Sequence, residues 1–232
     1  MAIEAGKHIV TDLDFGLRIV EKAENKGVRL AVNQNGRWAP HWSYIRQAIK
    51  RGILGEVASV RLSVNWDHNW IAGSIFENIC FLGDKTPARL FASTAVAPGQ
   101  RVKPPLLSQV LIEYPGAQAM IFFDANTCCG EQDATYVSGT KGSVLSVGPD
   151  LNEQAVTLAT PEGLARPQLR GSWFPDGFHG TMGELLRAIE EKREPENAGR
   201  NNLKSLELCF AAIASAARKE PVTPGSVRKL PA

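Results

Sequence analysis

The chain has 232 residues, 44% hydrophobic and 22% charged, which is enough apolar material to bury a globular core. Its 26 basic and 24 acidic residues are spread along the sequence, so neither nucleic acid nor an anionic membrane is an expected partner. No apolar run approaches the ~20 residues of a membrane span, and the N-terminus lacks the apolar stretch of a signal peptide. We therefore expect a cytoplasmic protein that binds a small molecule.

The first elements predicted along the chain follow a shortened β-α-β rhythm. Residues 15–26 carry apolar side chains at helical spacing with charges opposite, and Gly27 follows as a helix-ending residue. Residues 28–32 are predicted to form a short apolar strand, after which a polar, glycine-containing run turns the chain. A second amphipathic helix is predicted from His41 to Arg51.

From residue 57 the pattern changes to alternation of apolar and polar residues, which is typical of strands. Short turns at residues 114–116 and 139–142 join successive runs and indicate antiparallel pairing. The predicted strands span residues 57–66, 90–96, 106–114, 117–123, 135–137, 144–147 and 155–159. The middle of the chain is thus predicted to be a meander-like sheet.

The last third returns to helical spacing, at residues 183–192 and 203–218. Before these helices, residues 172–180 are predicted to form an aromatic, turn-rich loop. His179 in this loop is a candidate for substrate binding, with hydrogen bonding to its own loop as the alternative. Together the elements predict an α+β fold centred on one antiparallel sheet.

The four cysteines lack the spacing of a metal site, so we expect reduced thiols, with a metal or redox role as the alternative. They are Cys80, Cys128, Cys129 and Cys209.

Four short landmarks, in this order and at these separations, carry a resemblance to a known family. They are Ala5–His8, Gly52–Val57, Gly139–Ser143, and Ser205–Ala216 with Pro221-Val222 after it. In these the chain resembles the glucose-fructose oxidoreductase/inositol dehydrogenase (Gfo/Idh/MocA) family. The resemblance implies the end of a Rossmann-like domain in residues 1–38. It also implies an open-faced, mostly antiparallel sheet flanked by helices in residues 39–232, which would bind substrate and join the subunits of a dimer or tetramer.

The chain departs from the family pattern where hydride transfer would take place. It has no Gly-x-Gly-x-x-Gly turn, no Glu-Lys-Pro lysine after Val10, and no His/Asp pair between Phe76 and Cys80. We therefore leave the catalytic residues unknown. Either a deletion removed these segments, or the sequence as written omits them. We favour omission, because the loss of buried strands would expose edges and apolar surface that aggregate.

Two groups of residues remain as candidate binding sites. Residues 66–70 combine two indoles, which stack on sugar rings, with polar groups that hydrogen-bond hydroxyls; packing is the alternative. The substrate candidates are Trp66, Asp67, His68, Asn69, Trp70 and His179. By resemblance, the loop after residue 32 lies beside cofactor, which makes Asn35, Arg37 and Trp38 cofactor candidates, although an arginine in a turn is also commonly solvated.

The resemblance implies an NAD- or NADP-dependent oxidoreductase that acts on a sugar, an inositol or a related polyol. Because of the missing segments, we expect the chain as written to be inactive. Two alternatives remain open. One is a non-catalytic binding and dimerisation module, and the other is an enzyme that borrows its cofactor domain from another polypeptide.

Overall fold

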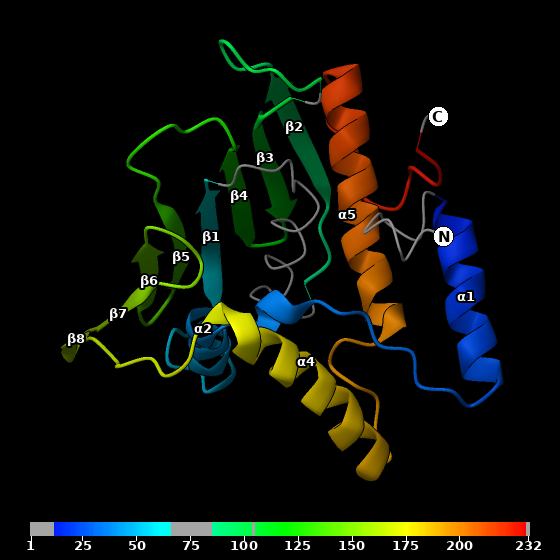
Figure 1. The fold of residues 1–232 in the computed structure, drawn as a ribbon, viewed down its shortest axis with the longest axis horizontal. Coiled ribbons are helices and arrows are strands. Elements are labelled where there is room, and N and C mark those ends of the chain that lie inside the picture. The colour runs from blue at the N-terminus through cyan, green and yellow to red at the C-terminus, as the bar shows by residue number, and fades with distance from the viewer. Residues whose placement is uncertain (1–11, 66–84, 104, 231–232) are drawn as a thin grey trace.

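The computed structural model describes residues 12–65, 85–103 and 105–230 and shows a sheet with helices packed against it (Figure 1). The helices are α1 (Leu13–Asn25), the 3-10 helix η1 (Asn35–Trp38), α2 (Pro40–Lys50), α4 (Trp173–Glu190) and α5 (Gly199–Arg218). None of these described helices is long and apolar enough to cross a bilayer. The predicted α+β class is confirmed.

The sheet has eight strands in the order β2-β3-β4-β1-β5-β6-β7-β8. They are β1 (Val57–Val64), β2 (Arg89–Ala95), β3 (Leu107–Tyr114), β4 (Ala117–Asp124), β5 (Asp133–Gly139), β6 (Ser143–Gly148), β7 (Ala155–Thr160) and β8 (Gly163–Ala165). Antiparallel pairing dominates, as predicted. The simple meander is wrong in one respect, because β1 lies between β4 and β5 and runs parallel to β4. The short edge strand β8 was not predicted.

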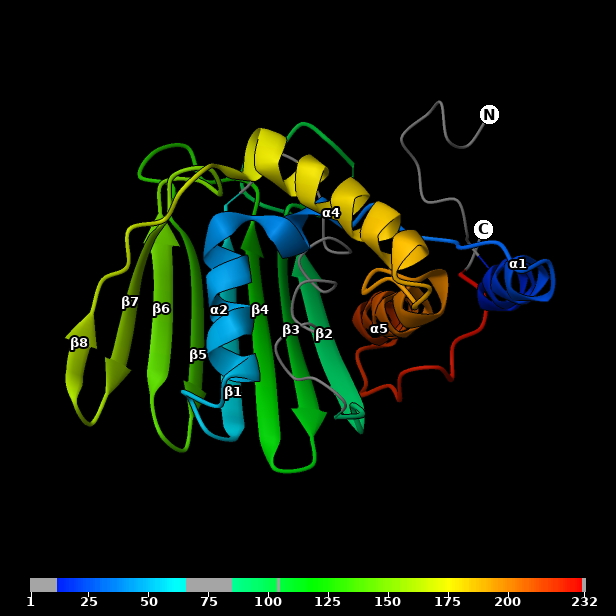
Figure 2. The same cartoon turned by 90° about the horizontal axis from the view of Figure 1, so that it is seen from below.

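One face of the sheet forms the core. Alternate residues of the strands, such as Val60, Ile112 and Phe123, are buried there. Helix α2 covers this face with Trp42, whose indole nitrogen donates to the Thr135 hydroxyl on β5 at 3.0 Å, and α5 packs against β2 (Figure 2). The amphipathic pattern of each helix therefore reflects burial on one side only.

The opposite face of the sheet carries a row of apolar side chains that stay exposed. Cross-strand pairing places Phe91 beside Leu111, Leu111 beside Met120, and Met120 beside Arg61. The row continues on β5, where the Arg61 guanidinium lies 4.4 Å from the ring centre of Tyr136. Phe91, Leu111 and Met120 are 39–44% exposed. We call this side the open face.

The predicted strand at residues 28–32 is wrong. This segment makes a single bridge, between Ala31 and Ala198, and its backbone bonds run to the loop before α5. A strand needs a neighbouring strand to pair with, and among the described residues none lies beside this segment.

Helix α1 packs against α5.

The predicted loop at residues 172–180 is also wrong, because α4 begins at Trp173 and includes most of it. Glycine content made the segment resemble a loop, but two of these glycines serve packing. A Cβ on Gly177 would lie 2.7 Å from the Asn35 carbonyl oxygen, and one on Gly180 would overlap Trp38. Because these two glycines have no side chain, η1 packs closely on α4.

Candidate functional site

The ends of the parallel pair β1 and β4 bring polar side chains to one edge of the sheet. Asn65 follows β1, and its side-chain amide donates to the Asp124 carbonyl oxygen (3.3 Å) and the Thr127 hydroxyl (2.9 Å). The Asn65 backbone N–H donates to the buried Asp133 carboxylate at 2.6 Å. Asn65 is therefore fixed immediately before the predicted substrate segment, residues 66–70, which lies outside the described residues.

The turn between β6 and β7 extends this edge toward α4. The Gln154 amide donates to the Asp133 carbonyl oxygen (3.3 Å), and the Asn152 side-chain oxygen accepts from the Phe174 N–H (3.3 Å). The Trp173 indole donates to the Asn35 side-chain oxygen at 2.8 Å. In this way groups far apart in sequence meet at one end of the sheet. We call them the amide rim: Asn35, Asn65, Asn152, Gln154 and Trp173.

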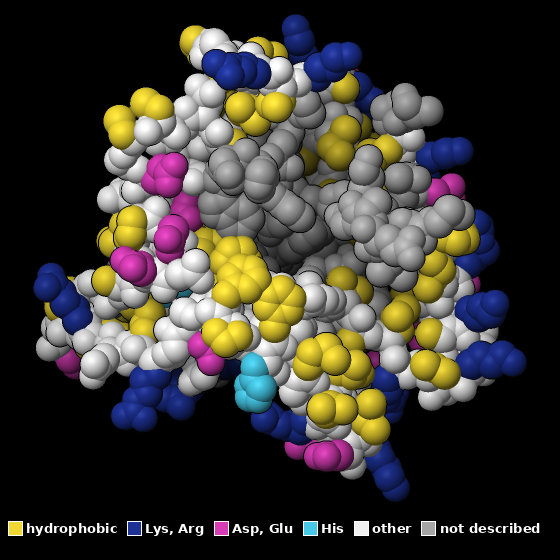
Figure 3. All heavy atoms as spheres, viewed as in Figure 1, with side chains coloured by type: hydrophobic (Ala, Val, Ile, Leu, Met, Phe, Trp, Pro, Cys, Tyr) yellow, Lys and Arg dark blue, Asp and Glu magenta, His cyan; other side chains and the backbone are white. Residues whose placement is uncertain are grey.

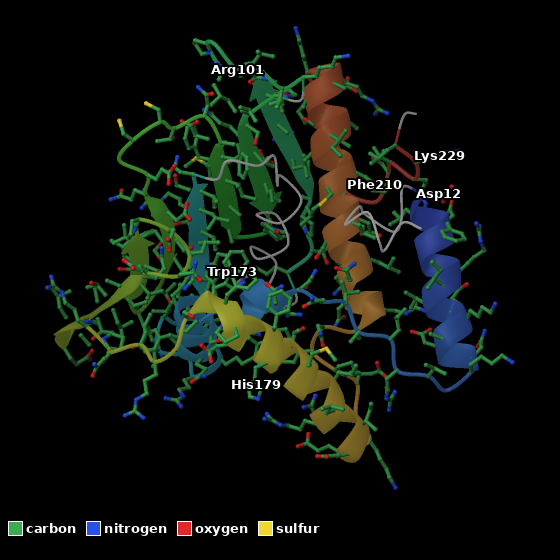
Figure 4. All side chains as sticks on the ribbon, in the orientation of Figure 1. Asp12, Arg101, Trp173, His179, Phe210 and Lys229 are labelled. Carbon is green, nitrogen blue, oxygen red and sulfur yellow. The ribbon has the colours of Figure 1, made fainter. Side chains whose placement is uncertain are left out.

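The amide rim lies at an accessible end of the molecule. Figure 2 shows α4 crossing the end of the sheet toward which β4 points, and Figure 4 shows Trp173 at the start of that helix. Trp173 is half-buried and its ring centre lies 4.4 Å from that of Phe174, which is 48% exposed. Aromatic surface thus adjoins neutral hydrogen-bonding groups.

The three predicted cofactor residues lie together on η1, but their side chains are engaged inside the chain. Asn35 accepts from Trp173, and the Arg37 guanidinium donates to the Glu196 carbonyl oxygen at 2.6 Å. Trp38 packs against Gly180. The central carbon of the Arg46 guanidinium lies 5.5 Å from the centre of the Trp38 ring. Asn35 is held through its side-chain oxygen and Arg37 through one guanidinium nitrogen, while the buried Arg37 Nε has no hydrogen-bond partner among the described residues.

Glu196 organises this region, and sequence reasoning missed it. Its carboxylate accepts from Arg46 at 3.0 Å and from Lys50 at 2.7 Å, both on α2. Burial by itself would raise the pKa of Glu196, but the cations of Lys50, Arg46 and Arg37 hold it below its usual value. The partners lie about 150 positions apart in sequence, so no local pattern could have indicated the pairing.

The remaining candidates are placed as follows. His179 is exposed on the outer side of α4, away from η1 (Figures 3 and 4). Cys128 and Cys129 are exposed thiols with their sulfur atoms 3.7 Å apart, while burial raises the pKa of the Cys209 thiol. Cys80 lies outside the described residues. Among the described side chains, no group of three or more His, Cys, Asp or Glu residues is arranged to hold a metal ion.

The chemistry of the amide rim is that of binding. Neutral amides offer both donors and acceptors to hydroxyl groups, and indole faces stack on the C–H surface of a ring. Such groups orient a polyhydroxylated molecule without transferring its protons. The chain does not fit a dinucleotide, because it lacks the glycine-rich turn that would hold the pyrophosphate.

Comparison with known proteins gives a consistent result. No sequence profile of a known protein family matches the chain. It is 26% identical to an inositol 2-dehydrogenase of Rhizobium meliloti over 243 residues, covering 96% of this chain and 73% of that protein. An uncharacterised oxidoreductase of Schizosaccharomyces pombe is 27% identical over 66% of this chain. The chain is therefore similar in sequence to oxidoreductases that include an inositol dehydrogenase, as the resemblance to the Gfo/Idh/MocA family implies. The first alignment is longer than the chain itself, so it contains gaps on this chain's side.

Solved structures show the same fold. An aldose-aldose oxidoreductase from Caulobacter crescentus matches with a TM-score of 0.75 at 19% identity, covering 96% of this chain and 73% of that one. An Agrobacterium radiobacter oxidoreductase, solved with NAD+ and L-tartaric acid, matches with a TM-score of 0.77 at 21% identity, covering 95% and 72%. The sheet and helices described above therefore share the fold of these oxidoreductases.

Proposed function

We propose that this chain is the substrate-binding part of an NAD(P)-dependent oxidoreductase that acts on a sugar, an inositol or a related polyol. In such a reaction the nicotinamide accepts or donates a hydride at an alcohol carbon. The role of this chain is to hold the ring by stacking near Trp173 and through residues 66–70, which the internally bonded amide rim anchors.

The observation that carries this proposal is the position of the amide rim in a chain whose relative is an inositol 2-dehydrogenase. Asn65 is fixed by four hydrogen bonds directly before residues 66–70, the segment with two indoles and an Asp-His pair. A polyol offers many hydroxyls and an apolar ring face, which matches amide and aromatic groups placed side by side.

We propose further that residues 1–38 are the remnant of a dinucleotide-binding domain and that residues 39–232 bind substrate and join subunits. The open face supports the second role, because Phe91, Leu111 and Met120 form an exposed apolar row across three strands. A second copy packed on this row would make a homo-oligomer.

The proposal is tested by titrating the purified chain with myo-inositol and D-glucose, followed by calorimetry and tryptophan fluorescence. We expect saturable binding of at least one of the two. Asn65→Ala should weaken it roughly tenfold, because the segment after β1 loses its anchor. Asn201→Ala, which removes an exposed asparagine on α5, is the matched control and should leave binding unchanged.

Addition of NAD+ or NADP+ to the same samples tests catalysis. We expect no reduced nicotinamide, since the lysine and the His/Asp pair of the family are missing from the sequence. Turnover by the chain alone would overturn the expected inactivity. Absence of binding to both polyols, or equal loss in Asn201→Ala, would overturn the binding role.

A second candidate is a non-catalytic dimerisation module derived from the same family. The observation that favours it is the sequence itself, which lacks the glycine-rich turn that binds the pyrophosphate of a dinucleotide. Such a module would remain oligomeric and would bind neither polyol nor dinucleotide, so the same titrations separate the two candidates.

A further inference from the structure

The outer face of α4 carries an apolar stripe that nothing in the described part of the chain covers. Phe178 is 37% exposed, Met182 56%, Leu186 59% and Ile189 52%. Their spacing of four, four and three residues places them on one side of the helix. The opposite side, with Gly177, Thr181, Glu184 and Ala188, is the buried one. Exposed apolar surface of this extent on a soluble protein marks an interaction site.

Gly183 lies beside this stripe and has no explanation within the chain. Gly177 and Gly180 are accounted for by the close approach of η1. A Cβ on Gly183 would meet nothing within 4 Å. Glycine inside a helix costs ~1 kcal/mol relative to alanine. Close approach of another backbone on the outer side would account for its presence.

The stripe is complementary to itself when two α4 helices pack antiparallel about Gly183. Phe178 of one copy then faces Ile189 of the other, and Met182 faces the Leu185-Leu186 turn. The exposed His179 at one end comes opposite the exposed Glu190 at the other, so each pairing occurs twice around the axis. Gly183 lies at the flank of this contact, roughly 100° around the helix from the centre of the stripe, where its missing side chain leaves room for the neighbouring helix.

We propose that the α4 stripe is a two-fold contact between two copies of this chain. It uses a different surface from the open face, whose exposed row lies on β2, β3, β4 and β1. Both contacts can therefore form in one assembly. A single helix pair buries less than the ~1,200 Å² of a stable interface, so association through α4 alone should be weak.

Analytical ultracentrifugation over a range of concentrations tests the contact. The background is the full chain with Met120→Lys, which removes the open-face row from the assembly. In this background we expect a concentration-dependent monomer–dimer equilibrium. Leu186→Glu should weaken it roughly tenfold, because a charge enters the apolar stripe. Leu164→Glu, which places the same charge at an exposed leucine on β8, is the matched control and should not weaken it.

Charge exchange tests the orientation of the pair. His179→Glu places like charges opposite each other and should weaken association several-fold, whereas His179→Glu with Glu190→Lys restores attraction and should recover it. A parallel arrangement, or a contact through another surface, would give no recovery.

Gly183→Gln separates a contact role from a structural one. The helix has room for the side chain, so thermal stability of the monomer should rise, while the added bulk at the flank of the contact should weaken association roughly tenfold. The proposal is overturned if the Met120→Lys chain stays monomeric, if Leu186→Glu leaves association unchanged, or if a different protein proves to occupy the stripe. Polyol binding is a separate readout, so failure here leaves the proposed function intact.

Discussion

His41 is a single buried side chain that contributes to the acid sensitivity of this protein. It is 1% exposed near the start of α2, its ring centre lies 4.7 Å from that of Trp42, and its Nε2 atom has no hydrogen-bond partner. Burial lowers the pKa of His41 to about 3, because the charged form would have no solvation. The residues around His41 in the sequence did not indicate that this histidine would be buried.

The sign of the pH effect follows from this shift. Between about pH 6.5, where an unfolded histidine titrates, and about pH 3, the unfolded chain binds a proton that the folded chain does not. Stability from this group is therefore lost as the pH falls below about 6.5. At about pH 5 the loss should reach ~2 kcal/mol.

Urea unfolding of wild type and His41→Phe at about pH 7.5 and about pH 5 measures this loss. The phenyl ring keeps the contact with Trp42 but cannot take up a proton. The fall in unfolding free energy between the two pH values should be smaller in the variant by ~2 kcal/mol. Equal falls in both proteins would show that His41 does not carry the effect.

Among the elements, α4 depends most on the absence of side chains. Gly180→Ala brings a Cβ into Trp38 at the base of its side chain, where rotation cannot relieve the overlap. We expect a net loss of ~2 kcal/mol, because overpacking outweighs the ~1 kcal/mol gain in helix propensity.

Gly183→Ala is the matched control on the same helix. Its Cβ meets nothing within 4 Å, so the propensity gain should appear as a stabilisation of up to ~1 kcal/mol. Both values come from urea unfolding at low protein concentration, where self-association does not contribute. Shifts of the same sign in the two variants would contradict the packing of η1 on α4.

Elements whose pattern is local could be predicted from the sequence. The strands with clean alternation and the turns at Gly116 and Gly139 were placed within one or two residues. Elements that depend on distant partners could not. Residues 28–32 have strand-like composition but lack a neighbour, and the beginning of α4 resembles a loop until η1 is seen against its glycines.

The candidate site shows the same division. Proximity of Asn35, Arg37 and Trp38 followed from their adjacency in sequence. Their bonds to Trp173 and Glu196 join positions more than 130 residues apart, which no pattern within one segment encodes. The amide rim is likewise a product of topology, since Asn65 and Asp124 meet because β1 and β4 run in parallel.

For the whole molecule, we expect the exposed apolar row of the open face to be the contact between subunits. Met120→Lys puts a second cation beside Arg61, its cross-strand partner, in the middle of the apolar row. The mass measured by light scattering should fall relative to wild type, because a packed second copy would bury both charges without partners. The site is 44% exposed in the single chain, so the thermal midpoint should change little.

Leu164→Lys provides the control for this change, since Leu164 is 73% exposed on β8, outside the row. Its mass should equal that of wild type. An unchanged mass in Met120→Lys would mean that the subunits meet elsewhere.

The central position of β1 has a consequence for how the protein is made. As the nascent chain leaves the ribosome, β1 emerges long before either of its neighbours, since Val60 pairs with Ala119 and with Val137. At ~5–20 residues per second, the second of these partners follows on the order of ten seconds later. During that interval the apolar strand β1 has no hydrogen-bonded neighbour on either edge. We therefore expect chaperones that act during translation to bind mainly at β1.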